Sequence, residues 1–234
     1  MSVVELRRLL VDRFPDAVPV TYGTAGAVAT GVGALDRLLP GGGLPRGRLS
    51  AWAPGGGATA VLLGACDVVV ASGERAAWID GAGTLAGGWR SWAGERGAWP
   101  LLLRPGGGKA ALECADELSR SGGFALVVLS GAEASGSESV RLSRSAREGG
   151  SAVVVVGAGV PVAALRFESR IRPEGCRWRP GPFGEPAEVE AAAVEVRVRG
   201  LGLSARTEFL LPVARHELRL SLEPGVVDRR GARP

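Results

Sequence analysis

Residues 46–65 read Arg46-Gly47-Arg48-Leu49-Ser50-Ala51-Trp52-Ala53-Pro54-Gly55-Gly56-Gly57-Ala58-Thr59-Ala60-Val61-Leu62-Leu63-Gly64-Ala65. The pattern predicts a short strand over residues 49–53, a glycine loop over residues 54–57 and a helix that starts at Ala58. A strand, a glycine loop and a helix start are together typical of a phosphate-binding loop, because bare backbone N–H groups there face the anion.

This loop lacks the lysine of the nucleotide-binding signature G-x-x-x-x-G-K-[ST]. With Gly57 as the second glycine, Trp52 stands at the first glycine position, Ala58 at the lysine and Thr59 at the hydroxyl residue. The lysine would reach the β- and γ-phosphates, and a charge-assisted hydrogen bond contributes about 1.5–3 kcal/mol. The residues of this degenerate loop are Gly55, Gly56, Gly57, Ala58 and Thr59. We expect no cofactor there.

A second glycine run precedes Lys109, which is the only lysine in the chain. Leu103 stands where the first glycine of the signature belongs, and Ala110 stands where Ser or Thr belongs. We interpret this stretch as a strand-to-helix turn rather than a second phosphate site.

Composition indicates a globular protein. Of the 234 residues, 46% are hydrophobic and 22% are charged. No apolar run reaches the roughly 18 residues that a membrane span needs, and no hydrophobic signal-peptide region follows the first charges. Cys66, Cys114 and Cys176 form no C-x-x-C pair, which is typical of a reducing cytoplasm. With one histidine, His216, a metal site is not expected. We expect a cytoplasmic protein without membrane contact.

The first 29 residues predict an amphipathic helix over residues 2–14 and then a linker that carries one short strand. The residues proposed to contact a partner are Leu6, Leu9, Leu10, Phe14, Val18 and Val20. Two interpretations stay open: this arm docks on a neighbouring subunit, or it packs on its own domain.

Residues 30–222 predict an α/β core. The predicted strands cover residues 49–53, 76–79, 100–103, 124–129 and 152–156, and the predicted helices cover residues 59–71, 85–94, 109–121 and 137–148. Strands that alternate with helices imply a mostly parallel sheet with right-handed crossovers.

The pattern changes after residue 162. Alternating apolar residues over 165–171, 194–198 and 209–211 predict strands with one solvated face, as an antiparallel extension of the same sheet. Residues 173–192 are rich in Pro, Gly and acidic residues and predict a turn or flexible loop. Residues 223–234 predict a basic, disordered tail.

Several segments occur in the same order as in the RecA recombinase core. They are Thr30-Gly31 with Ala34-Leu35-Asp36, Gly42-Gly43-Leu44-Pro45-Arg46-Gly47-Arg48, Ile79-Asp80, Ala111-Leu112-Glu113, Ser121-Gly122, Leu165-Arg166-Phe167 and residues 194–198. The chain therefore resembles RecA, and the resemblance implies a RecA-like core with a central, mostly parallel sheet flanked by helices.

The chain departs from RecA at the residues that carry the chemistry. Ala58 replaces the loop lysine, Ala82 stands at the catalytic glutamate position, and Leu129 ends the strand where the Mg²⁺-binding aspartate is expected. These three groups bind phosphate, activate water and hold metal in such enzymes. We expect a protein that does not hydrolyse ATP.

A RecA-like core of this length with a degenerate nucleotide site is similar to the ImuA family, which is also described as SulA-like. The resemblance implies a non-catalytic adaptor of the DNA-damage (SOS) response that supports error-prone translesion synthesis. Its implied partners are ImuB, RecA and a DnaE-type polymerase. The alternatives are an ATP-binding RecA-like recombinase and a SulA-type inhibitor of cell division that binds FtsZ.

Arginines concentrate between the core and the later strands. The candidate DNA-binding residues are Arg166, Arg170, Arg172, Arg177 and Arg179. Alternate residues of a strand share a face, so the first three are expected to line one surface. The net charge of +4 is compatible with weak, non-specific DNA binding, and equally with a solvated strand face in a chain of arginine-biased composition.

Overall fold

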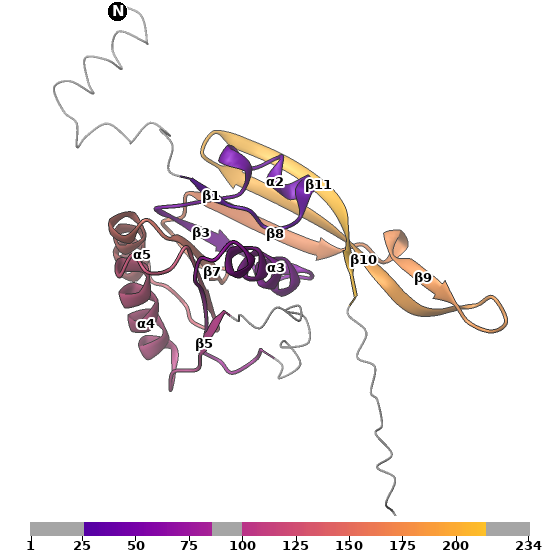
Figure 1. Ribbon diagram of the computed structural model, residues 1–234, viewed down its shortest axis with the longest axis horizontal. Helices are drawn as coiled ribbons and strands as arrows, with labels where there is room; N and C mark the ends of the chain where they lie inside the picture. Colours follow the sequence, from indigo (N-terminus) through magenta and orange to yellow (C-terminus); the bar gives the residue numbers. More distant parts are fainter. Residues whose placement is uncertain (1–25, 86–99, 214–234) are drawn as a thin grey trace, which may run out of the picture.

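The computed structural model describes residues 26–85 and 100–213 (Figure 1). The strands are β1 (Ala27–Val28), β2 (Leu44–Pro45), β3 (Arg48–Trp52), β4 (Ala76–Asp80), β5 (Leu101–Leu103), β6 (Leu126–Ser130), β7 (Ala152–Val156), β8 (Leu165–Ile171), β9 (Arg177–Pro180), β10 (Pro186–Gly200) and β11 (Leu203–Pro212). The helices are α2 (Gly33–Asp36), α3 (Ala58–Ala71), α4 (Gly108–Arg120) and α5 (Gly136–Gly149), with short 3-10 helices η1 (Pro40–Gly42) and η3 (Pro173–Gly175).

A nine-stranded sheet organises these elements. Its strand order is β11-β10-β8-β3-β7-β6-β4-β5, and β9 pairs with β10. The five strands from β3 to β5 run parallel to one another. Strands β6 and β7 are continuous apolar runs because helices cover both of their faces. The α/β fold with a mostly parallel sheet is confirmed. The predicted ends of β3 to β7 and of α3, α4 and α5 differ from the observed ends by at most two residues.

The sheet continues beyond β3 into an extension made of β8, β10 and β11. Strand β8 is parallel to β3, whereas β10 is antiparallel to both β8 and β11. Apolar and polar residues alternate along β8, which buries Leu165 and Phe167 on one face. The predicted antiparallel extension is therefore confirmed.

The predicted turn or flexible loop over residues 173–192 is wrong. This segment holds η3, all of β9 and the first part of β10, which together form a β-hairpin that projects from the body (Figure 1). Its prolines stand where prolines fit regular structure: Pro173 begins η3, Pro180 ends β9 and Pro186 begins β10. The Pro- and Gly-rich composition therefore predicted a loop, whereas the backbone of this segment forms two paired strands.

Helices cover the parallel strands from both sides and create two apolar cores. On one side α3 packs on side chains that include Trp52, Trp78 and Phe167. On the other side α4 and α5 pack on side chains that include Ile79, Leu129 and Val153. Figure 1 shows α4 and α5 together at one side of the sheet, away from the hairpin. No α-helix covers the α4/α5 side of β8, β10 and β11 among the described residues, although the short η3 lies against Ala193 of β10 on this side.

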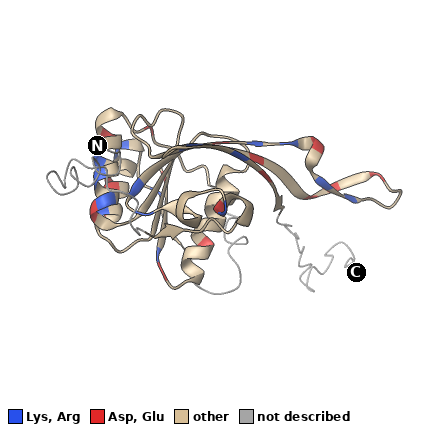
Figure 2. Ribbon diagram, turned by 90° about the horizontal axis from the view of Figure 1, so that it is seen from above, with Lys and Arg blue, Asp and Glu red and all other residues tan. Residues whose placement is uncertain are grey.

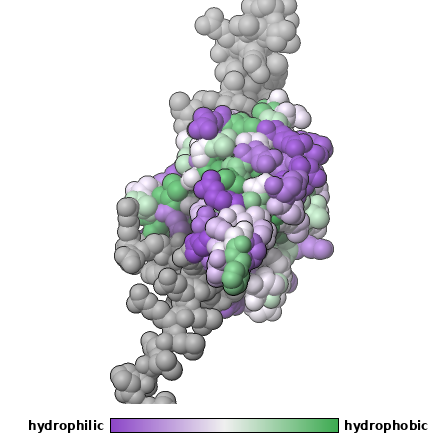
Figure 3. Space-filling view, turned by 90° about the vertical axis from the view of Figure 1, so that its right-hand side faces the viewer, coloured by the Kyte–Doolittle hydropathy of each residue, from purple (hydrophilic) through white to green (hydrophobic). Residues whose placement is uncertain are grey.

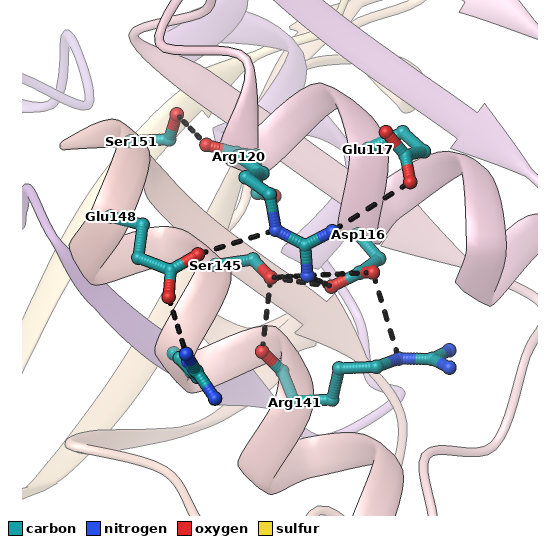
Figure 4. Close-up of polar contacts among 9 residues, drawn as sticks. Asp116, Glu117, Arg120, Arg141, Ser145, Glu148 and Ser151 are labelled. Atoms are coloured by element: carbon teal, nitrogen blue, oxygen red, sulfur yellow. Dashed lines mark hydrogen bonds and ion pairs between the residues drawn. The ribbon is translucent and has the colours of Figure 1, made fainter.

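A buried carboxylate joins α4 to α5 (Figure 4). Asp116 of α4 is 7% exposed and accepts a hydrogen bond from the Ser145 hydroxyl of α5. Arg120 donates to Asp116 at 3.1 Å and to Glu148 at 3.3 Å. Because both helices supply charged partners, this cluster fixes their relative position beneath the sheet.

Some predictions lie outside the described residues. These are the N-terminal helix over 2–14 with the six candidate contact residues, nearly all of the helix over 85–94, and the basic tail. In the part of the chain that the structure describes, no helix combines the length and apolar character needed to span a membrane.

Candidate functional site

The glycine loop has the predicted strand-loop-helix geometry. Strand β3 ends at Trp52, the loop follows, and α3 begins at Ala58 with Gly57 as its N-terminal cap. Gly57 has a φ of +89°, a left-handed conformation that favours glycine. The strand, the glycine loop and the helix start therefore follow one another as in a phosphate-binding loop, but no cationic side chain stands within residues 52–59.

Contacts with the sheet extension explain the three glycines of the loop. A Cβ atom on Gly55 would clash with the carbonyl oxygen of Ser169. A Cβ on Gly56 would lie 2.7 Å from Ile171 Cγ1, and one on Gly57 would lie 2.8 Å from Val194 Cγ1. The loop backbone thus lies directly on β8 and β10, and the absence of side chains permits this close approach.

Trp52, at the first glycine position of the signature, joins β3 to β8 of the sheet extension. Its side chain is fully buried and stacks on Phe167 with ring centroids 4.6 Å apart and planes 12° apart. Its Nε1–H donates to Ser169 Oγ at 3.0 Å. The next residue, Ala53, donates its backbone N–H to Phe167 O at 2.8 Å. This position is therefore part of the apolar core.

The end of β4 carries a carboxylate with a structural role. Asp80 is 1% exposed and accepts hydrogen bonds from the backbone N–H groups of Thr84 at 3.0 Å and Leu85 at 2.9 Å. Arg104 pairs with it at 3.4 Å. Asp80 therefore holds the following turn. Ala82, which the resemblance to RecA places at the catalytic glutamate, lies within that turn.

The end of β6 carries no carboxylate. Leu129 is fully buried in the core beneath α4 and α5. The next residue, Ser130, accepts a hydrogen bond from Trp78 Nε1 at 3.0 Å. Across residues 26–85 and 100–213, no group of three or more His, Cys, Asp or Glu side chains is arranged to hold a metal ion.

Lys109 lies in the first turn of α4, which begins at Gly108 and follows β5. The interpretation of residues 103–110 as a strand-to-helix turn is confirmed. The side chain is exposed and starts a different helix from the one that follows the glycine loop.

Charged side chains gather on the α4/α5 side of β8, β10 and β11. We define the arginine face by the arginines Arg166, Arg170, Arg172, Arg197, Arg199 and Arg206 and the glutamates Glu168, Glu195 and Glu208. The strand register places Arg166 opposite Arg199, and Arg170 opposite Glu195. Figure 2 shows positive and negative residues alternating along these strands. Arg166, Arg170 and Arg172 therefore share a face, as predicted.

The other two candidate arginines lie elsewhere. Arg177 and Arg179 belong to β9 in the hairpin. Arg179 pairs with Glu188 at 3.2 Å and with Glu190 at 3.1 Å, so its charge is compensated. The five candidates therefore do not form a single cluster.

Six residues of the arginine face were missed from the sequence: Glu195, Arg197, Arg199, Arg206, Glu168 and Glu208. The alternation of charged residues with valines over residues 194–199 indicates that the first three share a face. Only the pairing of β10 with β11 places Arg206 opposite Arg197.

Glu195 is the centre of this face. It is 2% exposed and accepts hydrogen bonds from Arg170 at 2.8 Å and Arg172 at 2.9 Å, with Arg206 at 2.6 Å and Arg197 at 3.2 Å as further ion pairs. The hydrogen bond from Arg170 is the largest influence, and with the other arginines it outweighs desolvation and lowers the pKa of Glu195 to about 2. Glu195 thus fixes four guanidinium groups around one carboxylate.

The charged groups around Glu195 are expected to make the free energy of unfolding depend on pH. Because the folded pKa of Glu195 is about 2 and the ordinary value is 4.5, its stabilising effect is complete above pH 4.5 and is lost as the pH falls toward 2. The gap in unfolding free energy between wild type and Glu195→Gln is expected to be constant near neutrality and to shrink across that window. Urea unfolding at a series of pH values measures it, with Glu168→Gln as the control for losing an exposed carboxylate. A gap that does not change with pH would contradict the assignment.

The chain is similar to RecA proteins in part of its sequence and to a recombinase structure in its fold. No family model matches the chain. Over 105 residues the chain is 39% identical to the RecA protein of Frankia casuarinae and to that of Cutibacterium acnes, which covers 44% of this chain and 30% of each relative. The chain thus spans less than a third of the length of these curated relatives.

The solved structure of the RadB recombinase is similar to this chain with a TM-score of 0.53 and 20% sequence identity. The match covers 76% of this chain and 94% of the RadB chain. At that identity the likeness concerns the fold. The sheet and its helices form a RecA-like core.

Proposed function

We propose that this protein is a non-catalytic RecA-like adaptor, which acts by binding other macromolecules and does not hydrolyse nucleotide. The observation that carries the proposal is the glycine loop. It keeps the strand-loop-helix order of a phosphate-binding loop but lies on β8 and β10, and Ala58 stands at the lysine position. A loop whose glycines are explained by packing does not require a bound phosphate for its geometry.

The surroundings of the loop support the same proposal. Phosphoryl transfer requires a cationic cradle, a metal ligand and a group that positions the nucleophile. The corresponding positions hold Ala58, Leu129 and Ala82, and the nearby Asp80 is occupied by backbone N–H groups and Arg104. Assembly surfaces are then the part of a RecA-like fold that remains available for function.

We propose that this adaptor acts in error-prone translesion synthesis during the SOS response, as in the ImuA family. Similarity to RecA proteins over 105 residues supports a role beside recombination proteins. The expected partners are ImuB, RecA and a DnaE-type polymerase. The arm expected to contact RecA is residues 1–21, which precede the described core.

A binding experiment with purified proteins tests this proposal. The tagged full chain is incubated separately with RecA, ImuB, a DnaE-type polymerase and FtsZ. Retention of at least one of the first three, without FtsZ, is the expected result. Retention of FtsZ alone would instead support a SulA-type division inhibitor and overturn the proposal.

Deleting residues 1–21 is expected to abolish RecA binding and to leave the core folded, because the described core has its own continuous sheet and two apolar clusters. Circular dichroism and thermal unfolding of the deletion variant provide the folding control. A well-folded variant that still binds RecA would contradict the docking role of the arm. Unfolding of the variant would show instead that the arm packs on its own domain.

A further inference from the structure

Strand β11 forms one edge of the nine-stranded sheet, and no strand among the described residues pairs with its outer side (Figure 1). The N–H of Val213 donates to Glu190 O at 2.9 Å, and the register pairs Pro212 with Ala191. Hydrogen bonding alternates along an antiparallel pair, so the odd-numbered residues of β11 bond to β10. The even-numbered residues turn their N–H and C=O groups outward, where proline is tolerated because its missing N–H has no partner. Such an open edge is a template for pairing with another strand.

A pocket of about 410 Å³ opens beside the end of this edge. Its walls are residues 30–32, one side of α3 and the last two residues of β11, Leu211 and Pro212. Asp67 of α3 is the one charged residue among those that line it. Leu211 and Phe209 pack on the α3 core but are only partly buried. Apolar surface therefore remains accessible on the α3 side of β11, next to its open edge.

The tip of the β9–β10 hairpin is another exposed apolar feature, but it is small. Phe183 at the turn is 95% exposed. Figure 3 looks at this end of the molecule and shows a small hydrophobic spot among hydrophilic residues at the near tip. Single apolar side chains at a surface are common. An open strand edge beside an apolar pocket is more specific, because it fits an extended segment with apolar side chains on one face.

The chain itself carries a segment of this kind directly after β11. Residues 214–234 lie outside the described part of the structure, and their sequence alternates over residues 217–223. Leucine occupies positions 218, 220 and 222, and the positions between them hold polar residues: Glu217, Arg219, Ser221 and Glu223. Strict alternation predicts a strand with one apolar face. Successive strands usually lie next to each other, and β11 is the strand that precedes this segment.

The loop between the two segments sets their register. Val213 and Ala214 do not suit a two-residue hairpin turn, because such turns favour Gly, Asn or Asp at positions with positive φ. A four-residue loop over residues 213–216 places Glu217 opposite Pro212. The three leucines then lie opposite Leu211, Phe209 and Thr207, on the α3 side of the sheet. A shift of one residue would turn all three leucines to the arginine face.

The charged residues of the two segments complement each other in this register. Glu223 lies opposite Arg206, and Arg219 lies diagonal to Glu208, both on the arginine face. Opposite charges at such cross-strand positions stabilise strand pairing. On the other face Leu218 lies beside Leu211, at the mouth of the pocket. Continuity of the chain, apolar pattern and charge therefore all favour the same occupant for this edge.

We propose that residues 217–223 add a strand antiparallel to β11, with its three leucines on the α3 side and Leu218 over the pocket. The chain thereby closes its own sheet edge and keeps β11 from pairing with another protein. This inference goes beyond the adaptor function, because it assigns to the chain itself a surface that would otherwise be open to a partner. It uses no residue of the glycine loop or of residues 1–21, so failure of either proposal leaves the other unaffected.

Disulfide trapping in the full-length protein tests the register. Thr207→Cys and Leu222→Cys form a facing pair, in a background with Cys114→Ser and Cys176→Ser, while the native Cys66 is buried. Facing residues of an antiparallel pair have Cα atoms about 4.5–5.5 Å apart, a separation that a disulfide spans. Mild oxidation is expected to join the two new cysteines within one molecule. Mass spectrometry of the unreduced peptides identifies the bond.

The matched control is Thr207→Cys with Glu223→Cys, which moves the second cysteine by one residue to the opposite face of the strand. This variant is expected to form little or no intramolecular disulfide. Equal yields in the two variants would overturn the proposal, because the segment would then have no fixed register. A disulfide between two molecules in place of the intramolecular one would also overturn it and would place a second copy of the chain at this edge.

Hydrogen exchange of the wild-type protein gives a second measurement that needs no engineered cysteine. The register predicts slow exchange for the outward amides of Glu208 and Leu210, because each gains an acceptor on the added strand. Leu220→Ser is expected to bring both amides to the rate of an unpaired strand edge, whereas Arg219→Ser, on the opposite face, leaves them slow. Fast exchange of these two amides in the wild type would contradict the proposal.

Discussion

Trp52→Ala is expected to lower the free energy of unfolding by about 3–5 kcal/mol, the range for removing a large aromatic side chain from a core. The indole is fully buried, stacks on Phe167 and donates to Ser169 Oγ. Loss of the ring leaves a cavity between β3 and β8 and leaves the Ser169 hydroxyl without its donor. Urea unfolding monitored by circular dichroism measures the change.

The control for this substitution is Trp178→Ala, because Trp178 is 47% exposed in the hairpin. Surface substitutions of this kind usually change stability by within about 0.5 kcal/mol. A loss below about 1 kcal/mol for Trp52→Ala would contradict the view that this position, which is the first glycine of the nucleotide signature, belongs to the core. Trp52→Gly should be at least as destabilising and should create no nucleotide site.

Ala58→Lys is expected to leave ATP hydrolysis at the rate of a protein-free blank. The new ammonium would supply a charge for the phosphates, but Ala82 and Leu129 still offer no group to activate water or hold Mg²⁺. The measurement is phosphate release with Mg²⁺ and ATP, with and without single-stranded DNA. Hydrolysis clearly above the blank in this single variant would show that other residues perform those roles.

The fold was readily predicted from the sequence because its signals are local. The apolar run of residues 152–156 and the strand-loop-helix pattern around Gly57 each predict their element without knowledge of the partners. Helix α5 likewise has a local N-terminal signal, a capping box between Ser135 and Glu138. The RecA-like arrangement follows from the order of these elements.

The contacts of the site were not predictable in the same way, because they join residues far apart in the chain. Glycines in the loop indicated a phosphate cradle, and nothing nearby in sequence shows that Ser169, Ile171 and Val194 lie against them. The position of Arg206 depended on the register of β10 and β11. The hairpin was missed because prolines and glycines, read one at a time, indicate a loop even where they begin and end paired strands.

The most direct test of the central claim is a calorimetric titration of Mg²⁺ and ATP into the wild-type protein. The glycine loop of this RecA-like core is proposed to serve as a structural joint on β8 and β10, with Ala58 in place of the phosphate-binding lysine. The account predicts no saturable heat at micromolar to millimolar nucleotide. Tight, saturable binding that requires Mg²⁺ would contradict it.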